Sequence, residues 1–360
     1  MGTTKGMAKQ PHGHSAVRQH FLPQFLLRGF SVPQGKKHYV YEFRSNGVAR
    51  RGEVKTVGYQ RRFYGSDALE GKLADRETRY ANLLQTLRVD SIDILAKPQI
   101  DEFVSHLLVR TNNLRSGLVQ MGRAMADGIK EQFDRAAPGS RIHHMIQETT
   151  QSLETRETIE REVQKLPEGM RPLYRQAMQD WMNSPSFADS LRAIASQAVP
   201  MIDIPTSVRD AQVQVLEEES NIQKRAKSLQ PFIWRMLDYE PNALVLGDHG
   251  PLGQETGQTS MKSLMMMEGI SVVYLPISHQ RLLVGALNGV TTQPDPEYLN
   301  ANSVELSHEL FVARTNSARE RAYLQLIGKR AMLYDPNELR NLIEEGLNPA
   351  TDITPFKPET

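Results

Sequence analysis

The spacing of apolar residues changes its period twice along the chain, and this feature most constrains the fold. Residues 14–66 hold short runs in which apolar and polar positions alternate, as in 37–43, with Gly and Asn between the runs. From residue 67 the apolar residues recur three, four and seven positions apart, as in amphipathic helices, and strand-like runs return after residue 229. We therefore expect an α+β fold, with a mixed or antiparallel sheet formed by the N- and C-terminal parts and a mostly helical middle region.

The same changes of pattern divide the chain into five stretches. In order, we expect a disordered tip, the N-terminal part of the core, a helical insertion, the C-terminal part of the core and a mobile tail, at residues 1–13, 14–127, 128–228, 229–350 and 351–360. Within the core, long helices are predicted from residue 67 and after Pro98, and a further helix is predicted at 302–314.

Composition excludes several classes of protein. The chain of 360 residues has 43 basic and 42 acidic residues, so no overall field draws it to nucleic acid or to an anionic membrane. It has no cysteine, which excludes disulfides, thiolate metal sites and cysteine nucleophiles and fits a reducing compartment. No apolar run reaches the ~18 residues of a membrane-spanning helix. We expect a cytoplasmic protein without a membrane partner.

One segment near the N-terminus predicts a site. In residues 20–30 three polar side chains, His20, Gln24 and Arg28, stand among apolar, Gly and Pro neighbours. Pro23 suits the first turn of a helix, which would place His20 just before that helix and the other two polar residues on one of its faces. Because polar groups on a buried segment need partners, we expect the three side chains to converge.

This segment resembles the N-terminal signature of the family named domain of unknown function 4238 (DUF4238), which opens with His, an aromatic, Pro-Gln, an aromatic, Leu-Arg and Phe. Further pieces follow in the order of the family, namely Phe63-Tyr64, Leu69-Glu70, Glu77, Arg110-Thr111, 247–251, 275–278, Asn316 and Ala318. Where the family usually shows Thr-Ser-Asp-Asn-Pro, residues 246–251 keep Asp248 but lack a hydroxyl before it. The family has no agreed activity, so the resemblance implies a site without naming its chemistry.

The side chains of the predicted site suit phosphodiester or nucleotide chemistry. Six residues make up this site: His20, Gln24, Arg28, Glu77, Asp248 and Asn316. In a nuclease without a cofactor, His20 would act as general acid or base and Arg28 would bind phosphate, while Gln24 and Asn316 would orient the substrate. In a second version, Glu70, Glu77 and Asp248 would hold a magnesium ion through water, although no acid-x-acid motif occurs among them.

The leading hypothesis is therefore a hydrolase that acts on nucleic acid or a nucleotide, and by association a toxin-like or defence-associated nuclease. The same residues would also suit a buried polar network, in which Arg28 pairs with Glu77 or Asp248 and His20 and Gln24 complete the hydrogen bonds. A second alternative is a non-catalytic sensor of an anionic small molecule or partner. A third is an interaction protein that forms homo-oligomers through the middle helices.

Overall fold

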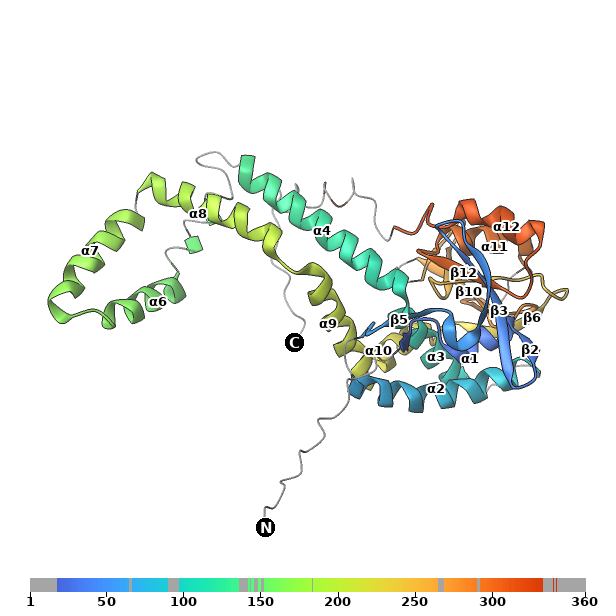
Figure 1. Cartoon of the computed structure of the whole chain (residues 1–360). Helices are drawn as coiled ribbons and strands as arrows, with labels where there is room; N and C mark the ends of the chain where they lie inside the picture. Colours follow the sequence, from blue (N-terminus) through green and yellow to red (C-terminus); the bar gives the residue numbers. More distant parts are fainter. Residues whose placement is uncertain are drawn as a thin grey trace, which may run out of the picture. The chain divides into compact units, whose positions relative to one another are not determined.

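The chain divides into two compact units, which are described separately (Figure 1). The computed structural model describes residues 18–64, 67–89, 97–135, 142, 144–145, 148–149, 152–182, 184–264, 269–289, 292–332, 339 and 341. Unit 1 comprises Met1–Gly117 with Ser207–Leu333, and unit 2 comprises Leu118–Thr206 with Tyr334–Thr360. The insertion predicted at 128–228 overlaps unit 2, whereas the predicted tip and tail lie outside the described residues.

The described strands of unit 1 form antiparallel sheets, one of which joins the two ends of the chain. In this sheet the long strand β3 (Lys37–Arg44) pairs with β2 (Val32–Gln34), with β4 (Ala49–Glu53) and with β12 (Leu310–Ala313). β12 in turn pairs with β7 (Leu246–Gly247). The predicted α+β class, with a sheet built from N- and C-terminal parts, is therefore confirmed, and the pairing is antiparallel.

Two further sheets complete the described strands of unit 1. One has two strands, β1 (Arg18–His20) and β5 (Tyr59–Arg61), and it carries His20, the first residue of the signature segment at 20–30. The other has five strands, in the order β6 (Ile233–Asp238), β11 (Arg281–Ala286), β10 (Ile270–Pro276), β8 (Leu252–Glu255) and β9 (Met261–Ser263).

An aromatic pair lies in the core beneath the sheet that joins the two ends of the chain. The rings of Phe43 from β3 and Phe311 from β12 are stacked with their centroids 4.6 Å apart, and both residues are fully buried. Tyr323 meets Phe311 edge-on from helix α12 (Ala318–Tyr323). Burial of such rings supplies much of the free energy that holds the N- and C-terminal parts together.

Two helices of unit 1 pack against a buried spine. The described helices that lie wholly in unit 1 are α1 (Gln24–Leu27), α2 (Asp67–Leu87), α3 (Lys97–Arg110), α10 (Glu219–Leu229), α11 (Pro296–Glu305) and α12, and most of α9 (Ile204–Glu217) also belongs to this unit. The spine is α3, which packs against α2 and α10 and is buried from Phe103 to Arg110. The predicted start of this helix at Lys97-Pro98 is confirmed, since α3 begins at Lys97.

The helix predicted at 302–314 is wrong from residue 306 onward. Helix α11 ends at Glu305, and residues 310–313 form β12 instead. All four residues of β12 are buried, and a short apolar run of this kind suits a strand as well as a helix. The pairing of β12 with β3, which lies about 270 positions earlier in the chain, stabilises the strand rather than a helix at these residues.

Unit 2 is helical, as predicted for the middle of the chain. Its described helices are most of α4 (Asn112–Arg135), α6 (Leu153–Gln164), α7 (Arg171–Met182), α8 (Pro185–Ala198) and the start of α9 (Ile204–Glu217). Ser152 caps α6 by accepting a hydrogen bond from the backbone N–H of Thr155. Across the described residues, no helix combines the length and apolar character needed to cross a membrane.

Candidate functional site

The signature segment is fixed by its backbone on both sides of Pro23. The N–H groups of Phe21 and Leu22 donate to the carbonyl of Gly58 at 3.0 and 3.2 Å. Pro23 stands at the N-cap of α1, in extended conformation, and the helix lasts a single turn before the 3-10 helix η1 (Arg28–Phe30). The prediction of a helix that starts at Pro23 is therefore confirmed, but the helix is too short to carry Arg28 on its buried face.

Arg88 closes the end of α1 from a distant part of the sequence. Its guanidinium donates to the carbonyls of Phe25 and Leu26 at 3.0 and 3.2 Å, and to that of Ile277 at 2.9 Å. The carbonyls of Phe25 and Leu26 belong to the last turn of α1, where a helix leaves its carbonyls without intrahelical N–H donors. A Cβ on Gly29 would overlap the Ile277 carbonyl oxygen and the Arg88 guanidinium, so only glycine fits at this position.

His20 and Glu77 are brought together through Arg110. The carbonyl oxygen of His20 accepts from Nε and Nη2 of Arg110 at 3.0 and 2.8 Å, and Nη2 also lies 2.5 Å from a carboxylate oxygen of Glu77. The His20 side chain is almost buried, with its ring centroid 5.9 Å from that of Tyr59. The predicted alternative of a buried polar network thus matches this part of the chain, with Arg110 in the place expected for Arg28.

The neighbours of Arg110 come from several of the pieces that resemble the family. The hydroxyl of Tyr64 donates to the Arg110 carbonyl at 3.3 Å, and the Tyr64 N–H donates to the Gln19 side chain at 2.6 Å. Next along the chain, the methyl group of Thr111 would lie 3.0 Å from a Cβ on Gly250. Sequence analysis noted Arg110 inside an apolar helix but did not include it in the site, although a charge at a buried helical position was the available signal.

Asp248 does not join the contacts around Arg110 and has other hydrogen-bond partners. Its fully buried carboxylate accepts from the backbone N–H groups of His308, Glu309 and Leu310 at 2.7, 2.8 and 3.0 Å. Burial raises the pKa of Asp248 to about 7, while these three donors act to lower it. The carboxylate therefore fixes the turn between α11 and β12, and the structure pairs it with no arginine through a described hydrogen bond.

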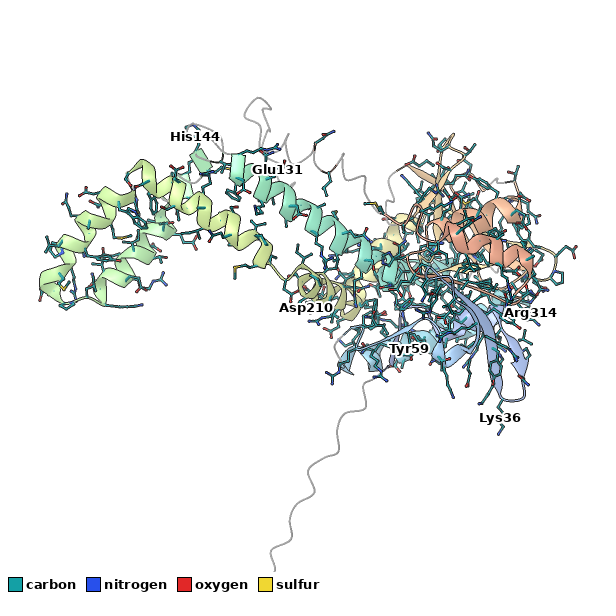
Figure 2. All side chains as sticks on the ribbon, turned by 45° about the horizontal axis from the view of Figure 1, so that its top comes forward. Lys36, Tyr59, Glu131, His144, Asp210 and Arg314 are labelled. Carbon is teal, nitrogen blue, oxygen red and sulfur yellow. The ribbon has the colours of Figure 1, made fainter. Side chains whose placement is uncertain are left out.

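The remaining predicted residues do not join this group. Asn316 is half-buried before α12, where its side-chain oxygen accepts from Nε of Arg321 at 2.9 Å. Gln24 is half-buried on α1. Arg28 is exposed, and the expectation of a buried Arg28 paired with Glu77 or Asp248 is wrong. Figure 2 labels Tyr59, the neighbour of His20, and Arg314, which reaches the Arg28 segment, and the two lie apart.

Arg28 instead begins a turn in which it alone is exposed, because Gly29, Phe30 and Ser31 are buried. This turn, residues 28–31, is called the Arg28 turn. Arg88 reaches its neighbouring carbonyls, and Nη1 of Arg314 donates to the Ser31 carbonyl at 2.7 Å. The N–H of His279 donates to the Gly29 carbonyl at 3.0 Å, and the hydroxyl of Ser31 lies 3.1 Å from Nδ1 of His38.

The positive groups of the Arg28 turn lack carboxylate partners within the described part of the chain. No ion pair is formed there by Arg28, Arg88 or Arg314. Burial lowers the pKa of Arg88 to about 10, and repulsion from Arg28 adds to this effect. Arg281, which donates to the Leu87 carbonyl nearby, differs because it is paired with Asp238 at 2.7 Å.

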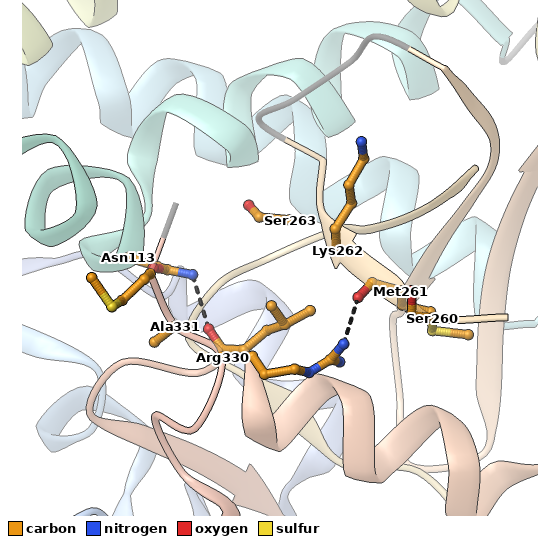
Figure 3. Close-up of a pocket in the computed structure, with 9 residues that line it drawn as sticks. Asn113, Ser260, Met261, Lys262, Ser263, Arg330 and Ala331 are labelled. Carbon is orange, nitrogen blue, oxygen red and sulfur yellow. Dashed lines mark hydrogen bonds between the residues drawn. The ribbon is translucent and has the colours of Figure 1, made fainter. Parts of the chain in front are cut away.

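A cavity of about 240 Å³ lies elsewhere in unit 1 (Figure 3). Its charged lining residues are already matched, since Lys262 pairs with Glu255, and Nε of Arg330 lies 2.8 Å from a carboxylate oxygen of Glu305. Arg330 also donates to the Met261 carbonyl, as Figure 3 shows. This cavity differs from the Arg28 turn in its charge balance, because each cationic side chain that lines the cavity is paired with a carboxylate.

Magnesium binding by Glu70, Glu77 and Asp248 stays a prediction. The side chain of Glu70 lies outside the described residues, while Glu77 contacts Arg110 and Asp248 contacts backbone N–H groups. Within the described ranges, no three His, Asp or Glu side chains are grouped as metal ligands.

Comparisons with known proteins identify the family. A family model described as "Protein of unknown function (DUF4238)" matches residues 18–329, which is most of the chain. The curated proteins and the solved structures gave no match. The matched region includes β1, the Arg28 turn, Arg110 and β12. The chain therefore belongs to the DUF4238 family.

Proposed function

We propose that the protein binds the phosphate groups of a nucleotide or nucleic acid at the Arg28 turn. One observation carries this proposal: three guanidinium groups, those of Arg28, Arg88 and Arg314, surround one turn without a carboxylate partner among the described residues. Like charges held together on a fold repel one another, and an anion between them would relieve this repulsion. Guanidinium groups bind phosphate in a bidentate geometry, as they also bind carboxylate.

The three arginines would contribute in different ways. Arg28 is exposed and its side chain makes no hydrogen bond in the described structure, so it can donate both arms of its guanidinium to a ligand. Arg88 and Arg314 are half-buried and donate to backbone carbonyls, so they would act through their charge and by fixing the turn. This division supports recognition of an anion in solution rather than a structural ion pair.

Binding without catalysis, the sensor alternative, fits the geometry better than the six-residue nuclease. The carboxylate of Asp248 and the amide of Asn316 are engaged in local structure, and Glu77 is engaged by Arg110. Hydrolysis of a bound phosphoester by His20 remains a second candidate. It is favoured by the firm placement of His20, whose peptide carbonyl is held by two N–H groups of Arg110.

The test measures binding of labelled single-stranded RNA, single-stranded DNA, duplex DNA and nucleotides to the wild type and to single variants. We expect Arg28→Ala to weaken binding by about tenfold or more, since it removes a charge-assisted contact. Arg28→Lys should recover part of the loss, because it keeps the charge but not the fork. Arg61→Ala removes another exposed arginine, which lies on β5, and serves as the control.

The same samples separate binding from hydrolysis. Cleavage that is lost in His20→Ala but kept in Arg61→Ala would establish the hydrolase, and lanes with magnesium or a chelator would show whether a metal ion is needed. Saturable binding without product would establish the sensor. Equal weakening in Arg28→Ala and Arg61→Ala would reject the Arg28 turn as the binding site, as would a folded wild type that binds none of the probes. We also propose that the protein is located in the cytoplasm.

A further inference from the structure

Strand β9 lies at the edge of its five-stranded sheet and lines the cavity of about 240 Å³ (Figure 3). Among the described strands, β9 pairs with β8 alone. In an antiparallel pair, every second residue directs its N–H and C=O groups away from the neighbouring strand. When such groups are buried, they need partners outside the sheet.

Met261 and Ser263 are the two residues of β9 whose backbone groups point away from β8. The Met261 N–H donates to the side-chain oxygen of Asn302 at 3.3 Å, and the Met261 carbonyl accepts from Nη1 of Arg330 at 3.2 Å. Because the direction repeats every two residues, the N–H and carbonyl of Ser263 point to the same side of β9. Arg330 lies on that side and also lines the cavity.

The backbone of Ser263 is without a partner on that side within the described part of the chain. The next residue, Leu264, points back to the sheet and donates to the Pro251 carbonyl at 3.5 Å, as the alternation requires. The N–H, the carbonyl and the hydroxyl of Ser263 make no described hydrogen bond, although the residue is only 7% exposed. Since buried backbone groups are paired in nearly all native proteins, this donor and acceptor indicate a ligand.

Asn113 adds a second unmatched group to the same cavity. Its side-chain nitrogen donates to the Leu306 carbonyl at 2.9 Å, which identifies the other atom of the amide as the oxygen. This oxygen is buried and accepts no hydrogen bond from the described residues. The lining therefore lacks a donor for Asn113 as well as partners for Ser263.

Charge and size restrict the ligand to a small neutral molecule. Lys262 and Arg330 line the cavity but pair with Glu255 and Glu305, so the charges of the lining are balanced. Pockets for drug-sized molecules measure about 300 to 1,000 Å³. A cavity of about 240 Å³ therefore suits a smaller molecule.

An extended peptide that adds a strand to the sheet does not fit this edge. Such a strand would need the outward N–H and carbonyl groups of both Met261 and Ser263. Those of Met261 are occupied by Asn302 and Arg330. The donor and acceptor that are left belong to one residue, which matches the length of a single amide group.

We propose that this cavity binds a small neutral molecule with an amide edge, that is, an N–H beside a carbonyl, as nucleobases and carboxamides carry. The N–H of the ligand donates to the Ser263 carbonyl, and the carbonyl of the ligand accepts from the Ser263 N–H. A further N–H on the ligand donates to the side-chain oxygen of Asn113. This site is separate from the phosphate binding proposed for the Arg28 turn and does not depend on it.

The first measurement titrates the full chain with uracil and with benzamide, and follows binding by saturation-transfer NMR. Each probe has a matched form in which methyl groups replace the amide hydrogens, 1,3-dimethyluracil and N,N-dimethylbenzamide. We expect uracil, benzamide or both to bind saturably, and the methylated forms to bind about tenfold more weakly because they cannot donate to the Ser263 carbonyl. Binding of uracil alone would identify a nucleobase, and binding of benzamide alone a carboxamide. If neither probe binds, or if methylation makes no difference, the proposal is wrong.

Ser263→Pro tests the contact with the backbone. It removes the N–H that points away from β8, and an outward N–H on an edge strand is where a sheet tolerates proline. We expect this variant to bind about tenfold more weakly, whereas Ser263→Ala keeps the backbone groups and should bind within about threefold of the wild type. An equal loss in both variants would assign the contact to the hydroxyl and overturn the role of the strand edge.

Ala331→Leu is a second test, which holds even if the proline variant does not fold. Ala331 lines the cavity from another segment of the chain, so a larger side chain there would take the space of the ligand. Ala322→Leu makes the same exchange at an exposed position of α12 and is the control. We expect binding to be lost in the first variant and unchanged in the second, with circular dichroism to confirm that both are folded. Equal binding by the two folded variants would place the ligand elsewhere and overturn the site.

Discussion

Arg110 contacts residues from three other segments of unit 1. Its guanidinium is buried, holds the carbonyl of His20 with two N–H groups and pairs with Glu77, and its own carbonyl accepts from Tyr64. A buried ion pair adds little stability compared with apolar residues of the same shape, but the loss of one member leaves the other without compensation. The residues that resemble the family around Arg110 therefore support the position of the signature segment.

We expect Arg110→Ala to lower the free energy of unfolding by about 3–5 kcal/mol, because Glu77 and the His20 carbonyl would both lose their donor. Urea denaturation followed by circular dichroism measures this change. Arg79→Ala removes an arginine that is exposed and pairs with an exposed Glu219, and it should cost at most about 1 kcal/mol. A similar small loss in both variants would show that the Arg110 network is not important for stability.

Asp248 gives a prediction about pH. An aspartate in an unfolded chain ionises near pH ~3.9, whereas burial raises the pKa of Asp248 to about 7 in the folded protein. Between these values the folded protein holds a proton that the unfolded chain has released, so this group's contribution to stability falls as pH rises from about 4 to about 7.

The measurement compares the free energy of unfolding of the wild type and of Asp248→Asn across this pH range. We expect the free energy of unfolding of the wild type, relative to that of Asp248→Asn, to fall as pH rises from about 4 to about 7. The comparison is needed because other titrating groups also affect each curve. Buried His249, whose pKa burial lowers to about 3, acts in the opposite sense because it favours folding as pH rises. A difference that does not vary with pH would contradict the raised pKa of Asp248.

At the scale of elements, the one-turn helix α1 determines where the signature side chains point. Sequence patterns predicted its start at Pro23, the strand at 37–43 and the long helices from residues 67 and 97, because these depend on local spacing. They did not predict that Arg28 is exposed. The end of the helix contacts Arg88 and Ile277, which lie 60 and 249 positions after Arg28 in the sequence. The grouping of the candidate site could not be predicted for the same reason. Tertiary contacts decide which side chains meet, so Arg110 and not Arg28 contacts Glu77, and a functional role for the six residues stays a prediction.

Glycine 29 tests this account of α1. We expect Gly29→Ala to destabilise the protein by about 1–3 kcal/mol, since its Cβ would overlap the Ile277 carbonyl and Arg88. Gly71→Ala in α2 is the matched substitution, because no atom lies within 4 Å of the added Cβ, and it should stabilise the protein by about 0.5–1 kcal/mol. Thermal unfolding of the two variants measures the difference, and equal effects would refute the close contact at Gly29.

At the scale of the whole molecule, the two units differ in what stabilises them. Unit 1 has stacked aromatics, paired strands and a buried spine, whereas many of the exposed large apolar residues belong to unit 2. Within unit 1 the side chain of Arg115 donates to Gln212 at 2.7 Å, and Gln212 donates to the Val109 carbonyl at 2.8 Å. The two segments of unit 1 that flank residues 118–206 are therefore joined by contacts of their own.

We expect a chain in which residues 118–206 are replaced by a flexible linker of about ten Gly and Ser residues to fold on its own. It should unfold cooperatively in urea and keep the phosphate binding proposed for Arg28. A deletion variant without cooperative unfolding would show that unit 1 depends on the residues removed.

The pairing of β3 with β12 also has a consequence for synthesis of the protein. β3 ends at Arg44 and β12 ends at Ala313, so the ribosome must add about 270 further residues before these two strands can pair. At about 5–20 residues per second this delay lasts roughly a quarter of a minute to a minute. During that time one edge of β3 and the ring of Phe43 are without their native partners, so the newly made N-terminal part is a natural client for a chaperone that shields strand edges.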